Sequence, residues 1–100
     1  MNKFNVFFVI ISFLVVSCGP TARFTYQAEE VTAPATVTFK NESEKAETYE
    51  WNFGDGDTSM TDMPSHRYFA SGNYKVELTA KKGKKASTTT KNLVIKAPEI

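Results

Sequence analysis

The nine residues Tyr49-Glu50-Trp51-Asn52-Phe53-Gly54-Asp55-Gly56-Asp57 decide the fold of this chain. Their three aromatic side chains stand at alternate positions, which places them on one face of a β-strand. The two glycines that follow favour a tight turn, because glycine adopts positive φ and the neighbouring aspartates tolerate it. This stretch therefore predicts a half-buried strand over residues 49–53 and a turn over residues 54–57.

The same alternation of apolar and polar residues continues on both sides. It predicts further strands over residues 24–26, 36–40, 74–81 and 92–96. Residues 86–90 are small, β-branched or polar, which is typical of an edge strand. Turn-forming residues separate these runs at 41–43, 71–73 and 82–84. Without an apolar face at helical spacing, the pattern predicts an all-β sandwich or barrel.

Four sequence blocks carry a resemblance to a known family. Residues 51–56 are similar to a Trp-Asp-Phe-Gly-Asp-Gly signature, with Asn52 in place of the first aspartate. Residues 64–68 match Pro-x-His-x-Tyr, residues 72–78 match Gly-x-Tyr-x-Val-x-Leu, and residues 37–43 match a strand that leads into Asn-x-Ser. The chain thus resembles the PKD domain. The resemblance implies an immunoglobulin-like β-sandwich of about seven strands in two sheets over residues 24–97. Its motif residues here are Trp51, Phe53, Gly54, Asp55, Gly56, His66, Tyr68, Gly72 and Tyr74.

The first part of the chain has the pattern of a secretory signal. Lys3 precedes an apolar run over residues 6–16, which is too short to span a bilayer. Val15-Val16-Ser17-Cys18 resembles a bacterial lipobox, which implies cleavage after residue 17 and acylation of Cys18. We expect a lipoprotein signal peptide over 1–17, then a lipidated cysteine and short tether over 18–23. The alternatives are a retained anchor helix and an ordinary buried cysteine.

The length of the chain and the balance of its charges limit the functions that it can have. Removal of 17 residues from the 100-residue chain would leave 83, enough for one domain. Lys3 is the one charged residue of the removed part, so 11 basic and 11 acidic side chains would remain. This balance argues against a nucleic acid partner, because such interfaces are markedly basic.

Two groups of polar residues are candidates for chemistry. Asp55 and Asp57, with Asn41 and Ser43, are candidate calcium ligands, since calcium prefers oxygen ligands. The alternative is that the glycines shape a turn in which Asp55 bonds its own backbone. His66 is the only histidine and stands in no nucleophile motif. We therefore expect no enzyme, no cofactor unless calcium binds, and a packing or hydrogen-bonding role for His66.

Surface contacts are the remaining candidates. Lys81, Lys82, Lys84 and Lys85 form a possible contact patch for acidic glycans or lipid phosphates, or else a solvated turn. Tyr49, Tyr68, Phe69 and Tyr74 would stack on sugars if exposed, but an aromatic stripe in a sandwich is usually core. We expect a non-catalytic lipoprotein of the bacterial envelope, attached to a membrane through Cys18, in the outer membrane facing the periplasm. Its partner would be an envelope protein or, alternatively, a polysaccharide.

Overall fold

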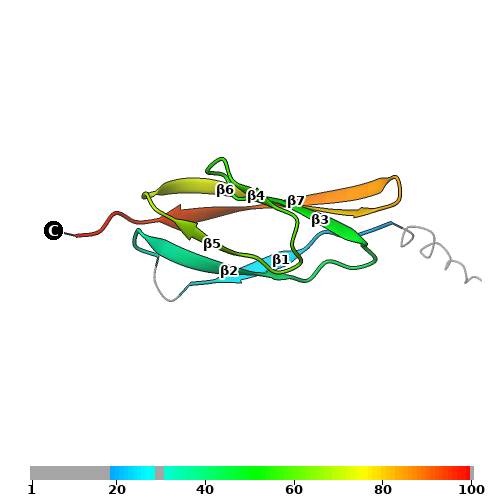
Figure 1. Cartoon of the computed structure of the whole chain (residues 1–100), viewed down its shortest axis with the longest axis horizontal. Helices are drawn as coiled ribbons and strands as arrows, with labels where there is room; N and C mark the ends of the chain where they lie inside the picture. The colour runs from blue at the N-terminus through cyan, green and yellow to red at the C-terminus, as the bar shows by residue number, and fades with distance from the viewer. Residues whose placement is uncertain (1–18, 29–30, 100) are drawn as a thin grey trace, which may run out of the picture.

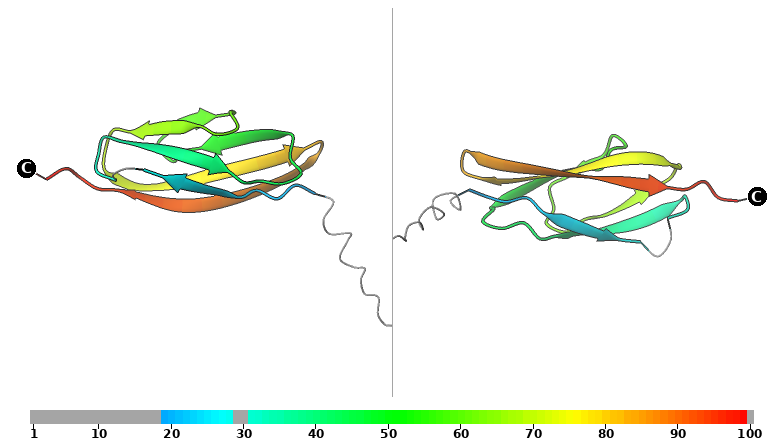
Figure 2. Two further views of the ribbon diagram at one scale, coloured as in Figure 1. Left: turned by 90° about the horizontal axis from the view of Figure 1, so that it is seen from below. Right: turned by 180° about the vertical axis from the view of Figure 1, so that it is seen from behind.

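The computed structural model describes residues 19–28 and 31–99, which contain seven β-strands. The strands are β1 (Phe24–Gln27), β2 (Ala35–Asn41), β3 (Thr48–Asn52), β4 (Thr58–Ser59), β5 (Ser65–Tyr68), β6 (Gly72–Lys82) and β7 (Lys85–Ile95). One antiparallel sheet has the order β1-β2-β5 and the other the order β4-β3-β6-β7. The sheets lie face to face as two layers (Figures 1 and 2). The predicted β-sandwich is confirmed, and no helix in the described ranges has the length and apolarity to cross a bilayer.

The core lies between the two sheets and is built from alternate residues. Strand β2 alternates buried and exposed positions along its whole length, with Val37 and Phe39 fully buried. From the opposite sheet Trp51 is only 1% exposed, and its ring centroid lies 5.4 Å from that of Phe39. The indole Nε1 of Trp51 donates a hydrogen bond to the carbonyl of Thr61 at 2.9 Å. Full burial of this large side chain therefore leaves no unsatisfied donor.

Several element boundaries differ from those predicted. The predicted edge strand over residues 86–90 does lie at the edge of its sheet, but it continues without a break into the predicted last strand, so that residues 85–95 form β7. The reason is backbone pairing, since β7 matches β6 residue by residue from Lys82 and Lys85 to Gly72 and Ile95. Strands β4 and β5 escaped prediction because their few residues show no extended alternation. Tyr26, two residues after the buried Phe24, is 36% exposed.

Residues 21–23 are joined to the sandwich, although the sequence assigned them to a tether. Thr21 and Glu44 exchange two backbone hydrogen bonds of 2.9 Å, and Glu42 donates to the carbonyl of Arg23 at 2.8 Å. The amide of Ala22 donates to the hydroxyl of Ser87 on β7 at 3.1 Å. The predicted signal peptide over 1–17 and the predicted lipidation site Cys18 lie outside the described residues.

Candidate functional site

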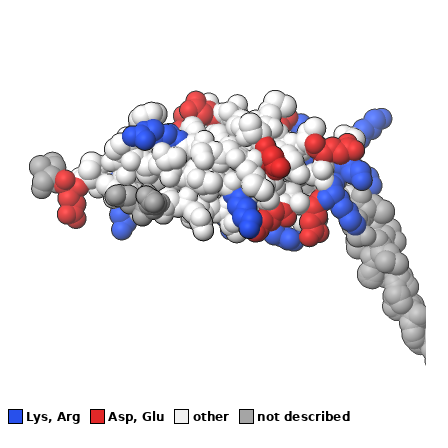
Figure 3. All heavy atoms as spheres, turned by 60° about the horizontal axis from the view of Figure 1, so that its bottom comes forward, with Lys and Arg blue, Asp and Glu red and all other residues white. Residues whose placement is uncertain are grey.

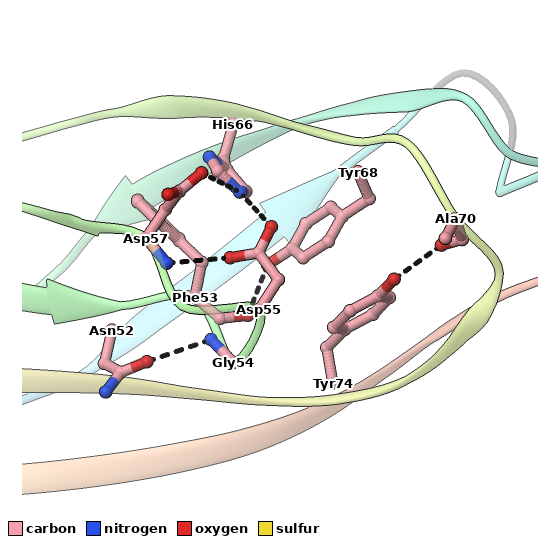
Figure 4. Close-up of polar contacts among 9 residues, drawn as sticks. All are labelled: Asn52, Phe53, Gly54, Asp55, Asp57, His66, Tyr68, Ala70 and Tyr74. Carbon is pink, nitrogen blue, oxygen red and sulfur yellow. Dashed lines mark hydrogen bonds and ion pairs between the residues drawn. The ribbon is translucent and has the colours of Figure 1, made fainter.

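The loop between β3 and β4 is held by its own side chains (Figure 4). The amide of Gly54 donates to Oδ1 of Asn52 at 3.0 Å, and the amide of Asp57 donates to Oδ1 of Asp55 at 3.2 Å. Both are side-chain turns that span two residues. Asn52 departs from the usual aspartate of the signature, but its amide oxygen still supplies the acceptor that this turn needs.

Gly54 allows this loop to lie directly on strand β6. Its φ is 88°, and a Cβ atom there would lie 2.8 Å from both the backbone nitrogen and the backbone oxygen of Lys75. Real Cβ atoms do not approach so closely, and backbone atoms within a sheet cannot move aside easily. The glycine of the signature is therefore required by close packing as well as by its dihedral angle.

His66 fixes the other side of the loop. Its ring stacks on Phe53 with centroids 4.2 Å apart and planes at 7°. Its Nε2 lies 2.7 Å from Oδ2 of Asp55 and 3.8 Å from Oδ2 of Asp57. Burial alone would raise the pKa of Asp55. The hydrogen bonds from His66 and from the amide of Asp57 outweigh that effect and hold this pKa below its ordinary value of 3.8.

Two tyrosines close the site, Tyr68 at the end of β5 and Tyr74 on β6. The hydroxyl of Tyr68, which is fully buried, donates to the carbonyl of Phe53 at 2.9 Å. Burial raises the pKa of this phenol well above its ordinary value, and the negative charge of Asp55 adds to the shift. Tyr74 packs against Tyr68 with ring centroids 4.4 Å apart and donates to the carbonyl of Ala70 at 2.5 Å. The loop is therefore fixed on both sides by buried and half-buried rings.

The four predicted calcium ligands do not come together as one site. The Nδ2 of Asn41 donates to both the carbonyl and a carboxylate oxygen of Asp62, and its Oδ1 accepts from the amide of Ser43. His66 lies opposite Val37 on β2, whereas Asn41 lies four residues further along, roughly 13 Å away at strand spacing. These contacts divide the four residues into two groups.

Asp55 and Asp57 lie beside His66 rather than beside further oxygen ligands. Asp55, Asp57 and His66 have potential ligand atoms within 4.8 Å of one another. Both carboxylate oxygens of Asp55, however, already accept hydrogen bonds, one of them from an imidazole. Calcium takes six to eight oxygen ligands, so this cluster is a poor match for it. Asp62, the partner of Asn41, was not found from the sequence, because nothing in its local pattern marks it.

The Asp55 and His66 pair is not hydrogen-bonded to a nucleophile among the described residues. Within residues 19–28 and 31–99, Asp55 is the one side chain that hydrogen-bonds to His66. An aspartate can orient a histidine, but catalysis of acyl transfer also needs a nucleophile beside the base. The arrangement instead joins the β3–β4 loop to strand β5.

The four predicted contact lysines stand at the tip of the β6–β7 hairpin. Lys81 forms an ion pair with Glu50 at 2.7 Å, whereas Lys82, Lys84 and Lys85 are exposed. The acidic stretch over residues 42–50 lies at the same end, since Thr48 pairs with Lys81. Figure 3 shows both signs of charge gathered where the chain leaves toward its N-terminus.

The aromatic residues considered as a sugar platform are mostly internal. Tyr68 is fully buried, and Tyr49 and Tyr74 are partly buried against the core. Phe69 is 76% exposed, with the guanidinium of Arg67 lying 5.5 Å from its ring centroid. Sequence reasoning did not find the shallow groove beside it, on the outer face of the β1-β2-β5 sheet. Its lining includes Tyr26, Gln27, Thr36, Thr38 and Arg67.

The sequence is similar to parts of known collagenases. The chain is 45% identical over 62 residues to the collagenase ColA of Bacillus cereus, and 39% identical over 51 residues to the collagenase ColA of Clostridium perfringens. The first match covers 60% of this chain but 6% of the collagenase, and the second covers 51% and 4%. The chain thus spans only a small part of the length of these relatives.

Solved structures of isolated domains match over more of their length. The PKD1 domain of the Vibrio anguillarum protein Epp is 32% identical, with a TM-score of 0.68 over 80% of this chain and 96% of that domain. The PKD1 domain of the Vibrio cholerae metalloprotease PrtV is 29% identical, with a TM-score of 0.67 over 78% and 98%. A structure of carbohydrate-binding modules of the β-sandwich superfamily is 26% identical, with a TM-score of 0.71 over 79% of this chain and 35% of that one. A sequence profile described as the PKD domain covers residues 18–97, so this chain belongs to the PKD domain family.

Proposed function

We propose that this protein is a lipid-anchored, non-catalytic PKD module of the bacterial envelope that presents a rigid surface to another envelope protein. The observation that carries the proposal is the attachment of residues 21–23 to the sandwich through backbone bonds with residues 42–44. A lipid on Cys18 would be separated from Thr21 by only two residues, Gly19 and Pro20. The domain would therefore be held close to the membrane by one end, without a long flexible linker.

The opposite end of the sandwich is the surface that such an anchor would present. Strand pairing places Gly72 opposite Ile95, and Ala35 opposite Tyr68, at the end from which the C-terminus leaves (Figure 1). Phe69 follows Tyr68 there and is 76% exposed. Aromatic residues and arginine are both enriched at protein interfaces relative to the rest of the surface. Phe69 and its neighbour Arg67 are thus the proposed centre of contact with a partner.

Acylation is tested by feeding labelled palmitate to bacteria that express the full chain. Label should be incorporated in the wild type and lost in Cys18→Ala, and the wild type should fractionate with membranes. Two or three acyl chains give stable anchoring, whereas one chain holds a protein only marginally. Equal labelling of the wild type and Cys18→Ala, or no labelling of either protein, would rule out a lipid anchor on Cys18.

The contact surface is tested separately, by chemical crosslinking in intact envelopes. Phe69→Ser should weaken a specific crosslinked product. Met60→Ser is the matched control, because Met60 is similarly exposed at 72% but lies after β4, away from this end. Equal crosslinking in the two variants would exclude Phe69 as the contact.

A polysaccharide ligand is the second candidate, supported by the groove on the β1-β2-β5 sheet and by the likeness to carbohydrate-binding modules. Tyr26 offers a partly exposed ring, and Thr36, Thr38 and Arg67 supply polar groups beside it. Small-molecule sites are typically concave, with aromatic or apolar lining and a few placed polar groups. Binding to purified envelope polysaccharide, lost in Tyr26→Ala but kept in Phe69→Ser, would favour this function over the first.

A further inference from the structure

The tip of the β6–β7 hairpin lies beside the residue that follows Cys18. A Cβ atom on Gly19 would lie 3.7 Å from Cδ of Lys85, and Ala22 is hydrogen-bonded to Ser87 on the same strand. Figure 1 shows the hairpin at the end from which the N-terminal segment leaves. The described part of the chain therefore begins next to this tip, one residue after Cys18.

The charges at this end are unevenly paired. Glu44 lies 3.8 Å from Arg23, and Glu50 lies 2.7 Å from Lys81. By contrast, the exposed residues Lys82, Lys84 and Lys85 form no ion pair or side-chain hydrogen bond with any residue of 19–28 or 31–99. The side chain of Glu47 is the one acid at this end that is likewise unpaired among those residues. The tip therefore keeps an excess of positive charge.

The hairpin holds these lysines in a repulsive arrangement. Lys82 and Lys85 are direct cross-strand partners, and like charges in that position destabilise a hairpin. The two-residue turn has φ of 60° at Gly83, the first central position, as in the type II′ turns that match strand twist. Behind it, the hydroxyls of Thr79 and Thr88 lie 3.0 Å apart across the ladder. A rigid ribbon thus projects clustered cations for which the described part of the fold supplies no anion.

We propose that this lysine tip, formed by Lys82, Lys84 and Lys85, binds the phosphate headgroups of anionic phospholipids and sets the tilt of the domain on the membrane. The proposal rests on acylation of Cys18, as proposed above. Consecutive Cα atoms are about 3.8 Å apart, so Gly19 lies within one Debye length, about 8 Å at physiological ionic strength, of an acylated Cys18. At that distance the surface potential of anionic lipids attracts each lysine. The acyl chains hold the protein at the membrane, and the lysines orient it.

The test uses the full-length acylated protein in vesicles of neutral phosphatidylcholine, with and without phosphatidylglycerol. A fluorophore on Ala86→Cys, an exposed site beside the tip, reports contact through a quencher attached to lipid headgroups. Quenching should be strong only with phosphatidylglycerol and should fall in high salt. Each lysine contributes about a fivefold preference for the surface, so Lys82→Gln with Lys84→Gln should reduce tip contact at least about 20-fold. The control is Lys75→Gln with Lys96→Gln, exposed positions toward the far end, which should leave the quenching unchanged.

Each outcome discriminates between the two proposals. The mass of the mature N-terminus reports acylation independently of the tip, and an unmodified Cys18 would overturn both. If Cys18 is acylated, equal quenching on neutral and anionic vesicles would contradict lipid binding by the lysine tip without affecting the proposed lipid anchor. Lipid binding by the tip would also be contradicted if the tip bound, in a salt-sensitive way, an acidic polysaccharide added to neutral vesicles.

Discussion

Replacing Tyr68 with phenylalanine would remove one oxygen atom from the interior of the sandwich. The ring of Tyr68 packs against His66 at 4.7 Å and Tyr74 at 4.4 Å, and these contacts do not involve the hydroxyl. The hydroxyl itself donates to the carbonyl of Phe53 at 2.9 Å in a buried position. The substitution therefore separates one hydrogen bond from the surrounding packing.

The expected loss of stability follows from burial of the acceptor. A buried carbonyl that loses its donor costs about 1–3 kcal/mol, more than the net gain of about 1 kcal/mol from an ordinary hydrogen bond. For a domain of this size such a loss corresponds to a fall in Tm of roughly 4–8 °C per kcal/mol. Tyr74→Phe is the matched control, since its acceptor, the carbonyl of Ala70, is in an exposed bond and can bind water instead. We expect the control to cost less than about 1 kcal/mol.

Urea unfolding measures both variants. Trp51 is the only tryptophan and is 1% exposed, so its fluorescence reports entry of water into the core. Tyr68→Phe should lower the midpoint by about 1 M without a change in the slope m, because the native fold is retained. If the two variants were equally stable, the buried hydrogen bond to Phe53 would contribute nothing to holding the loop in place.

Three further predictions concern the same loop. Gly54→Ala should cost at least about 2 kcal/mol more than Gly56→Ala, since both have positive φ but only Gly54 lies against the Lys75 backbone; equal costs in urea unfolding would contradict this. The pKa of Asp55 is lower in the folded state, so its charge stabilises the fold above pH 3.8 and this contribution is lost as the pH falls through the folded pKa. The free energy difference between wild type and Asp55→Asn should therefore shrink in acid, and a difference that grew instead would reverse the assigned sign. Calcium should leave Tm unchanged relative to chelator, because His66 and the amide of Asp57 already occupy the Asp55 oxygens; a rise in Tm that Asp57→Asn abolishes would show that the cluster rearranges around the ion.

The strands that the sequence predicted well are those in which buried and exposed residues alternate over several positions. Strand β2 alternates at every position, and in β3 Trp51 is buried and Tyr49 is partly buried. Period-two alternation reports only whether a residue is buried. It therefore could not reveal β4, which has two residues, or β5, where Tyr68 is the one buried side chain. It also could not show that β7 continues unbroken through residues 88–90, none of which is buried, because backbone pairing with β6 maintains that strand.

Within the loop, the local contacts were predictable and the long-range ones were not. The bond from Asp57 to Asp55 spans two residues, and turn chemistry anticipates it directly. The bond between His66 and Asp55 spans 11 residues, and that between Tyr68 and Phe53 spans 15. Each joins strands whose relative position depends on sheet order and register, so only the resemblance to a family indicated that these residues belong together.

A chain with balanced charge can still have a local excess of positive charge on one part of its surface. Equal numbers of acids and bases outside the predicted signal argue against a nucleic acid partner, but they do not describe any one surface. Strand β3 begins at Thr48, opposite Lys81, so the hairpin that joins β6 to β7 projects beyond it with its lysines. The acids behind it are largely neutralised, Glu50 by Lys81 and Glu44 by Arg23. Since salt screens charges beyond about one Debye length, a surface within that distance of the tip would respond to the unpaired lysines rather than to the net charge.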